Sequence, residues 1–220
     1  MNLNEKKSSR RNFLGAAAAL SLATVSGQLK ANAASPFAVN PEAGEEWFTK
    51  IKGKHKIVFD APGHNEGMPL AWPRVFQMTN SSDGKTDDLG IVVIFRHNGL
   101  PLAFEDRLWA KYNLGEVFKI NDPATNAPSK RNFYWKPQAG ALPIPGMATN
   151  ELMESGVLFA TCLMAIFHYS GIVAKKMGLD HETVRKDWIA GILPGIQPQP
   201  SGVFAVNRAQ EHGCTYCFAG

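Results

Sequence analysis

Residues 91–95 form an unbroken apolar run, Ile-Val-Val-Ile-Phe, which Arg96 ends. A strand with one solvated face would alternate apolar and polar residues, so this run predicts a strand that is covered on both faces. Strands of this kind are typical of parallel sheets, in which crossover helices cover both sides. The run therefore favours an α/β fold, a three-layer sandwich in which helices flank a mainly parallel sheet.

The rest of the chain alternates between strand-like and helix-like stretches. Short strands are predicted at 55–60, 156–161 and 213–218 in addition to 89–95. Helices are predicted over 67–80, 101–112, 162–177, 180–188 and 202–212, with Asp180 and Ser201 as N-caps of the last two. The Pro-rich stretch 193–202 predicts a loop with room for a short edge strand. Five prolines in 120–149 predict a long loop, which is either a lid or subunit contact or a plain insertion.

The composition indicates one soluble globular domain. Of the 220 residues, 45% are hydrophobic and 19% are charged, which excludes a disordered, collagen-like or multi-spanning membrane protein. The net charge of +4 resides in residues 1–33, and the remainder is neutral. The charge pattern therefore predicts no nucleic-acid partner. Nucleotide-binding glycine motifs and the serine-hydrolase motif are also absent from the sequence.

The N-terminal segment predicts an export signal. Arg10 and Arg11 precede Phe-Leu and an Ala-rich apolar run, and an Ala-Asn-Ala cleavage motif ends at Ala33. The pattern resembles the bacterial twin-arginine signal, which implies the twin-arginine translocation machinery as a partner and the periplasm as the location. An amphipathic or buried helix is the alternative. The predicted organisation is a signal peptide at 1–33, a lead-in segment at 34–54 and an α/β domain at 55–220.

Polar side chains and one cysteine follow the predicted strands. His64 comes after the first strand, Arg96, His97 and Asn98 follow the second, and Cys162 ends the third. Carboxyl ends of parallel strands share one edge of a sheet, where ligands bind, so we expect these residues along that edge. Cys162 also opens a helix, whose N-terminal amides favour a thiolate. We therefore predict Cys162 and His97 as catalytic residues and His64, Arg96 and Asn98 as binding residues.

Each of these residues also has an ordinary structural role open to it. Cysteine in an apolar stretch is more often a small buried residue than a nucleophile. The histidines can form hydrogen bonds with the loop backbone, and Arg96 can be an ordinary surface residue at the end of a strand. Asp60 can be a turn or cap residue. His168 is a poor partner for Cys162, because six residues along a helix rotate it to another face.

Cys214 and Cys217 form a Cys-x-x-Cys motif, for which we consider four interpretations. Phe218 occupies the position where a c-type haem site needs histidine, so haem is excluded. The pair forms a redox disulfide, or half of a metal site completed by His212, Cys162 or a second subunit, or has a structural or second sulfur-handling role. An extended backbone would place the two Cα atoms about 10 Å apart, too far for a disulfide without a turn.

From about Lys54 to the end, the chain resembles the DsrE/DsrF-like family of sulfur-relay proteins. The resemblance is carried by residues 91–99, 156–162, 193–196, 200–203 and 210–213. It implies a persulfide at Cys162, a homo-oligomer and a sulfur donor or acceptor protein as partner. The export signal, the Pro-rich loop and the C-terminal cysteine pair depart from the cytoplasmic members.

Two functions follow as expectations. One is an exported sulfur-handling protein, a persulfide carrier or thiol-redox protein that acts through Cys162. The other is a non-enzymatic subunit of a periplasmic complex that binds a small ligand or a metal. The corresponding bound groups are persulfide sulfur and a metal ion.

Overall fold

The fold is built on a parallel sheet. The computed structural model describes residues 41–81, 86 and 88–220. Within them the sheet has five strands in the order β4-β3-β2-β1-β5, and every neighbouring pair is parallel. The strands are β1 (His55–Ala61), β2 (Leu89–Phe95), β3 (Leu158–Cys162), β4 (Ile196–Gln199) and β5 (Thr215–Phe218). The predicted α/β sandwich with a mainly parallel sheet is confirmed.

The apolar run that favoured this fold lies at the centre of the sheet. Residues 91–95 are at most 2% exposed, and β2 is paired with β1 on one side and β3 on the other. Ile91, Val93 and Phe95 belong to the larger apolar cluster, whereas Val92 and Ile94 belong to a smaller one. Successive residues of a strand face opposite sides, so the run supplies the core of both layers at once.

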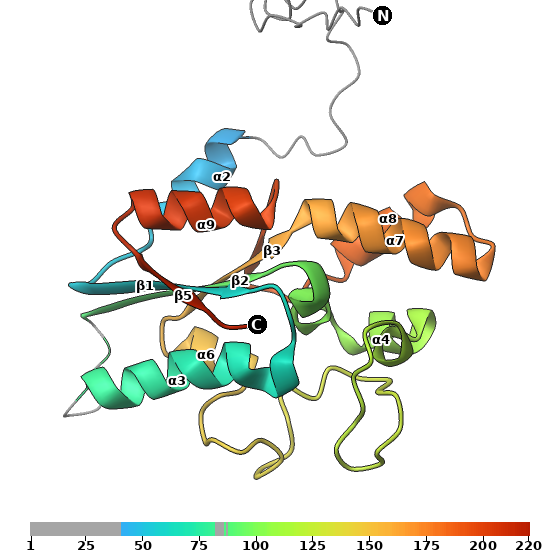
Figure 1. The fold of residues 1–220 in the computed structure, drawn as a ribbon, viewed down its shortest axis with the longest axis horizontal. Helices are drawn as coiled ribbons and strands as arrows, with labels where there is room; N and C mark the ends of the chain where they lie inside the picture. The colour runs from blue at the N-terminus through green and yellow to red at the C-terminus, as the bar shows by residue number, and fades with distance from the viewer. Residues whose placement is uncertain (1–40, 82–85, 87) are drawn as a thin grey trace, which may run out of the picture. The chain divides into compact units, whose positions relative to one another are not determined.

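Helices α2 (Pro41–Phe48) and α9 (Gly202–Glu211) cover one face of the sheet (Figure 1). Trp47 and Phe48 of α2 pack in the smaller cluster together with Ala205 and Ala209 of α9. The second half of the predicted lead-in segment thus contributes core side chains to the domain.

The opposite face carries α3 (Met68–Asn80) and α6 (Thr149–Glu154), as Figure 1 shows. The larger cluster lies on this side and continues to the short helices of the connection between β2 and β3. Those are η2 (His97–Ala103), α4 (Asp106–Tyr112) and α5 (Leu114–Val117), and the single turn η1 (Asn65–Gly67) precedes α3.

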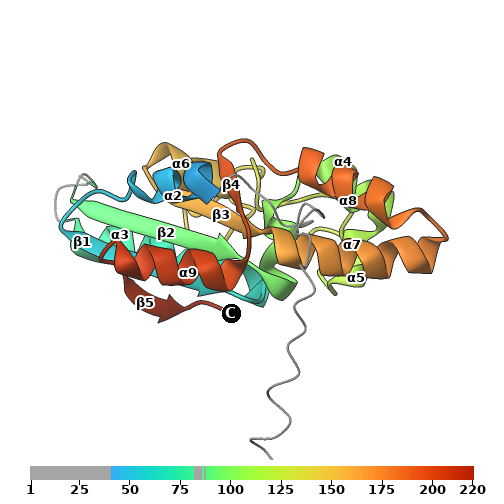
Figure 2. The same cartoon turned by 90° about the horizontal axis from the view of Figure 1, so that it is seen from above.

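Helices α7 (Leu163–Met177) and α8 (His181–Ala190) extend beyond the carboxyl ends of the strands and lie side by side in both views (Figures 1 and 2). The predicted caps are confirmed. Asp180 Oδ1 accepts a hydrogen bond from Thr183 N at 2.8 Å, and Ser201 Oγ accepts one from Phe204 N at 3.1 Å.

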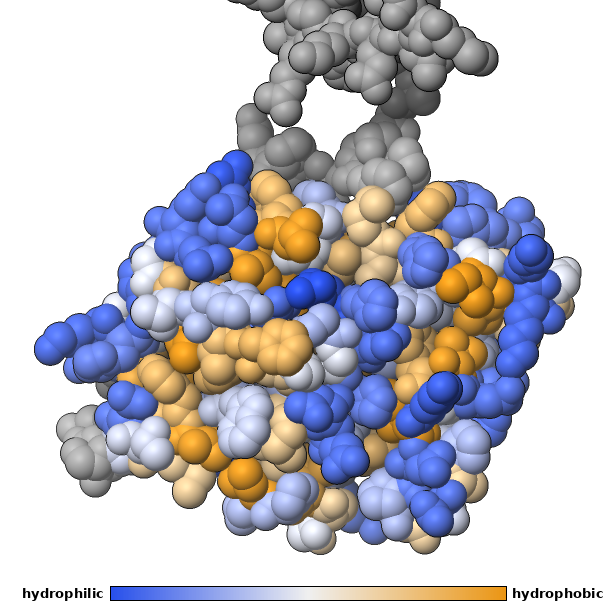
Figure 3. Space-filling view, in the orientation of Figure 1, coloured by the Kyte–Doolittle hydropathy of each residue, from blue (hydrophilic) through white to orange (hydrophobic). Residues whose placement is uncertain are grey.

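The edge strand β5 leaves apolar side chains in contact with solvent. Tyr216 is 48% exposed and Phe218 is 58% exposed. Apolar surface lies in the middle of Figure 3, where β5 crosses the front of the sheet in Figure 1.

Two segments differ in detail from the sequence prediction, and the short edge strand expected in 193–202 is present. The helix predicted over 101–112 is divided, because Phe104 is extended and bridges to Ile192, and α4 starts only at Asp106. The short helix α5 was not predicted. The loop 193–202 does contain an edge strand, β4, in which Pro198 is accommodated because one side of the strand is unpaired in the described sheet.

Candidate functional site

A cavity of about 480 Å³ lies at the carboxyl ends of β2, β3 and β4. It is bounded by the segment after β2, by the start of α7 and by the start of α9. Its lining is mostly apolar and consists of Arg96, His97, Cys162, Met164, Ala165, His168, Tyr169, Ser201, Gly202 and Val203. Parallel strands deliver their following residues to one edge of the sheet, which is why segments from distant parts of the sequence meet here.

Cys162 is both the last residue of β3 and the N-cap of α7. Its Sγ accepts a hydrogen bond from the backbone N–H of Ala165 at 3.2 Å. The side chain is buried, and the residue is 6% exposed. The helix α9 begins at the same cavity, with Ser201 as its N-cap. Two helix N-termini therefore present partial positive charge to the space that the thiol faces.

Arg96 lines this cavity, and its guanidinium forms a bidentate ion pair with Asp60. Its Nε and Nη2 donate to Asp60 Oδ1 and Oδ2 at 2.6 and 2.7 Å, and Tyr216 Oη donates to Asp60 Oδ2 at 3.0 Å. The hydrogen bond with Asp60 raises the pKa of Arg96, although burial opposes it. Asp60 is thus a buried partner of Arg96, more than the turn or cap residue that its position in the sequence suggests.

Gly202 lets α9 start directly against the Arg96 side chain. A Cβ at this position would lie 2.6 Å from both Cβ and Cδ of Arg96, closer than two carbon atoms can approach. The glycine therefore fixes how near the N-terminus of α9 comes to the guanidinium-bearing side chain.

His97 and Asn98 are placed by Tyr169 of α7. The His97 and Tyr169 rings pack edge to face with centroids 5.7 Å apart, and Tyr169 Oη donates to Asn98 Oδ1 at 2.7 Å. His97 has a φ of +47°, a left-handed conformation that costs energy for a residue other than glycine. His97 lines the cavity, whereas Asn98, which is predicted as a binding residue, is not among the residues that line it.

The prediction that His168 faces away from Cys162 is wrong, because both residues line this cavity. A rotation of about 100° per residue applies only when both residues lie within the helix. As an N-cap, Cys162 has extended backbone, and its side chain folds back over the first turn to Ala165. His168 and Ala165 are three residues apart and share a face of α7. The three-residue spacing between Ala165 and His168, both within the helix, is the sequence signal that would have placed His168 on this side of α7.

The structure does not bring His64 into the Cys162 cavity. His64 follows β1 at the same edge of the sheet but lines a separate cavity of about 380 Å³. Burial lowers its pKa, although the backbone of Phe118 and the charge of Glu66 oppose this.

Cys214 and Cys217 are free thiols that face opposite sides of the sheet. Cys214 packs in the cluster beneath α2 and α9, and Cys217 contacts the cluster on the other face. Burial raises the pKa of Cys214 to about 11, with Lys56 opposing, and also raises the pKa of Cys217. Among the described residues no group of three or more His, Cys, Asp or Glu side chains is arranged to hold a metal ion.

Comparison with known proteins leaves the family open: no family model matches the chain, and no curated protein matches it in sequence. The resemblance to DsrE/DsrF-like proteins accordingly stays a prediction. The predicted export signal, with Arg10, Arg11 and the cleavage motif at Ala33, lies outside the described residues. Within the described part of the chain, no helix is long and apolar enough to cross a membrane.

Proposed function

We propose that the protein carries sulfur as a persulfide on Cys162. The observation that supports this most is the position of the thiol, which caps α7 inside a cavity that also receives the N-terminus of α9 and the Arg96 side chain. Positive charge from helix termini and a guanidinium stabilises a thiolate, which is the nucleophilic form of cysteine. The same environment stabilises the anionic outer sulfur of a persulfide.

The transfer needs no external oxidant when the donor already contains sulfane sulfur. The Cys162 thiolate attacks the terminal sulfur of an inorganic polysulfide, and a new S–S bond forms at Sγ. The S–S bond of the donor breaks, and its electron pair leaves with the shortened polysulfide. We assign His97, which lines the same cavity, to accept the thiol proton. An acceptor thiolate then attacks the outer sulfur, and Cys162 leaves as a thiolate.

The apolar part of the lining serves the same chemistry. Ala165, Met164 and Val203 limit the water that reaches the sulfur. Met164 is 42% exposed and Val203 is 67% exposed, so they form an apolar rim that a donor or acceptor protein can contact. A homo-oligomer remains an expectation from the family resemblance.

Export belongs to the proposal, because the twin-arginine pattern directs the protein to the periplasm. Replacing Arg10 and Arg11 together with lysine should leave a precursor in the cytoplasm, whereas the charge-conserving control, Lys6→Arg with Lys7→Arg, should be exported normally. Cell fractionation followed by immunoblotting measures both. Equal periplasmic accumulation of the two double variants would contradict export through this pathway.

The alternative is a non-enzymatic subunit that binds a small ligand in the Cys162 cavity. Its support is the volume of about 480 Å³ with a mostly apolar lining, because small-molecule sites share both properties. In that case Cys162 contributes shape and the hydrogen bond to Ala165, and a serine in its place preserves the function.

Sulfur uptake by a matched pair of variants tests the proposal. The reduced full chain is treated with polysulfide, separated from excess reagent and measured by intact mass spectrometry. Cys162→Ser keeps a side chain that can cap α7, so its fold is preserved. We expect the intact mass of the parent and of Cys217→Ser to increase by the mass of sulfur. The mass of Cys162→Ser should not increase. If Cys162→Ser takes up as much sulfur as the parent, the carrier function is excluded and the binding subunit is favoured.

A further inference from the structure

Strand β5 leaves one edge of the sheet open. Within the described residues it pairs with β1 on one side and with no strand on the other. Figure 2 shows β5 at the outer edge of the sheet, beyond α9. Helices α3 and α9 pack mainly over β1 and β2, so they leave this edge accessible.

The outward backbone groups of β5 belong to Tyr216 and Phe218. The N–H of Ala219 donates to the carbonyl of Asp60 in β1 at 2.8 Å. Since the N–H and C=O groups of alternate residues in a strand point to the same side, Cys217 also faces β1, whereas Tyr216 and Phe218 face outward. Among the described groups, only the Cys217 thiol approaches the carbonyl of Phe218, at 3.6 Å. An open row of such groups is a ready template for another strand.

The sequence of β5 has no residue that keeps an open edge from pairing. Proteins block such edges with charged side chains, especially lysine, and with proline. The segment Thr215–Phe218 contains neither. The opposite edge strand, β4, contains Pro198, which has no N–H to extend the sheet. Of the two edges, β5 is therefore the one that is able to accept another strand.

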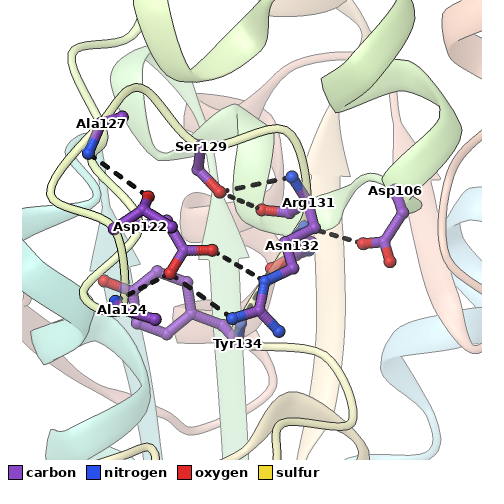
Figure 4. Close-up of polar contacts among 9 residues, drawn as sticks. Asp106, Asp122, Ala124, Ala127, Ser129, Arg131, Asn132 and Tyr134 are labelled. Carbon is purple, nitrogen blue, oxygen red and sulfur yellow. Dashed lines mark hydrogen bonds and ion pairs between the residues drawn. The ribbon is translucent and has the colours of Figure 1, made fainter.

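The long loop 120–149, for which a subunit contact is one expectation, bonds polar groups within its own chain (Figure 4). Arg131 Nε donates to Asp122 Oδ2 at 2.7 Å, and Ser129 Oγ donates to the carbonyl of Arg131 at 2.7 Å. The backbone N–H of Asn132 donates to Asp106 Oδ1 at 2.7 Å, which ties the loop to α4. These groups need no second molecule, in contrast to the outward groups of β5.

Aromatic surface flanks the open edge on both faces of the sheet. On the face that carries α9, Tyr216 and Phe218 are 48% and 58% exposed. On the other face, the Phe76 ring of α3 packs against Phe59 of β1 with centroids 6.3 Å apart. Trp72, 41% exposed, lies one turn before Phe76 on the same side of α3. Three aromatic side chains exposed to this extent present on the order of 300 Å² of apolar surface, a patch size that is often functional.

A second copy of β5 fits this edge in an antiparallel register centred on Cys217. Tyr216 then lies opposite Phe218 of the partner subunit, and all the outward N–H and C=O groups of both residues are paired. The two residues point to the same face, so two aromatic cross-strand pairs form, and no like charges meet. A register centred on Tyr216 would instead oppose Phe218 to Cys214, whose N–H already donates to the carbonyl of Ala209.

We propose that the protein forms a two-fold symmetric dimer in which two β5 strands pair antiparallel and join the two sheets into one. The dimer covers the patch of each copy, about 600 Å² of aromatic surface in all. Since roughly 57% of an interface is apolar, the total is about 1,000 Å², the lower limit of a specific interface. We therefore expect dissociation in the micromolar range. The interface is independent of sulfur chemistry at Cys162, whose cavity lies at β2, β3 and β4.

Sedimentation velocity of the reduced full chain at about 1–500 μM tests the dimer. Phe218→Lys introduces a residue that blocks edges and should weaken association about tenfold or more. Met78→Lys is the matched control, because Met78 is also 58% exposed but lies in a hollow beside Thr86. It should dimerise like the parent. A parent that is monomeric at every concentration, or equal dimerisation of the two lysine variants, would overturn the proposal.

Disulfide trapping in the unmutated protein tests the register. The two Cys217 Cα atoms would lie about 4.5 Å apart as a non-hydrogen-bonded pair, within the range of a disulfide. Diamide oxidises the two thiols: one S–S bond forms, and diamide takes up the two protons and two electrons. We expect parent and Cys162→Ser to give a dimer linked through Cys217, as peptide mass spectrometry would show, and Cys217→Ser to give none. A link through Cys214 or Cys162, or no link in a parent that dimerises, would contradict the register.

Discussion

Replacing Asp60 with alanine removes the carboxylate that holds Arg96 at the Cys162 cavity. The Asp60 side chain is 4% exposed and accepts from two nitrogens of Arg96 and from the hydroxyl of Tyr216. Breaking a buried ion pair by removing one partner costs about 3–5 kcal/mol. Since 28% of the Arg96 side chain is exposed, water solvates the orphaned guanidinium in part. We therefore expect Asp60→Ala to lower the free energy of unfolding by about 2–3 kcal/mol.

Urea unfolding of four proteins at neutral pH tests this value: the parent, Asp60→Ala, Arg96→Ala and the double variant. The double-mutant cycle isolates the interaction, and we expect a coupling free energy of about 2 kcal/mol. Tyr216→Phe removes one hydrogen bond from a solvent-accessible residue and should cost about 1 kcal/mol. A loss below about 0.5 kcal/mol in Asp60→Ala, or an equal loss in the presence and absence of Arg96, would refute the reasoning.

Two further predictions concern pH. Burial raises the pKa of Cys214 to about 11, so the stabilisation that the neutral thiol provides should be lost between about pH 9 and pH 11. The difference in unfolding free energy between the parent and Cys214→Ala should fall by about 2 kcal/mol over this range, and a constant difference would contradict it. Burial opposes ionisation of Asp187, but hydrogen bonds from Lys111, Tyr112 and Arg107 outweigh it and hold the pKa of Asp187 well below its usual range. Asp187→Asn should therefore cost about 2 kcal/mol at pH 7 and progressively less below about pH 4, as urea titrations at several pH values would show.

Much of the fold could be predicted because its signals are local. The apolar run at 91–95 specifies a strand that is covered on both faces. Asp180 and Ser201 specify helix starts, because each side chain accepts a hydrogen bond from the backbone N–H three residues later. The division of 101–112 could not be predicted, since it depends on the bridge between Phe104 and Ile192, which are far apart in the sequence. The packing of α2 on the sheet is likewise a tertiary property.

The candidate site could likewise be predicted only where local sequence determines it. Arg96, His97 and Cys162 meet because Arg96 and His97 follow one parallel strand and Cys162 ends the next, which the sequence pattern predicts. The role of Asp60 depends on the side-by-side placement of β1, β2 and β5, and strand order is not written in local periodicity. His168 was misjudged because the backbone at a helix cap departs from helical geometry.

Identifying which cysteine of the unmutated protein takes up sulfur tests the central claim most directly. The reduced full chain receives less than one equivalent of polysulfide sulfur, is alkylated to preserve any persulfide and is digested for peptide mass spectrometry. The account predicts that the added sulfur lies on the peptide that contains Cys162, because Cys214 is buried with a raised pKa and Cys217 lies outside the cavity. Sulfur found mainly on Cys214 or Cys217 would contradict it.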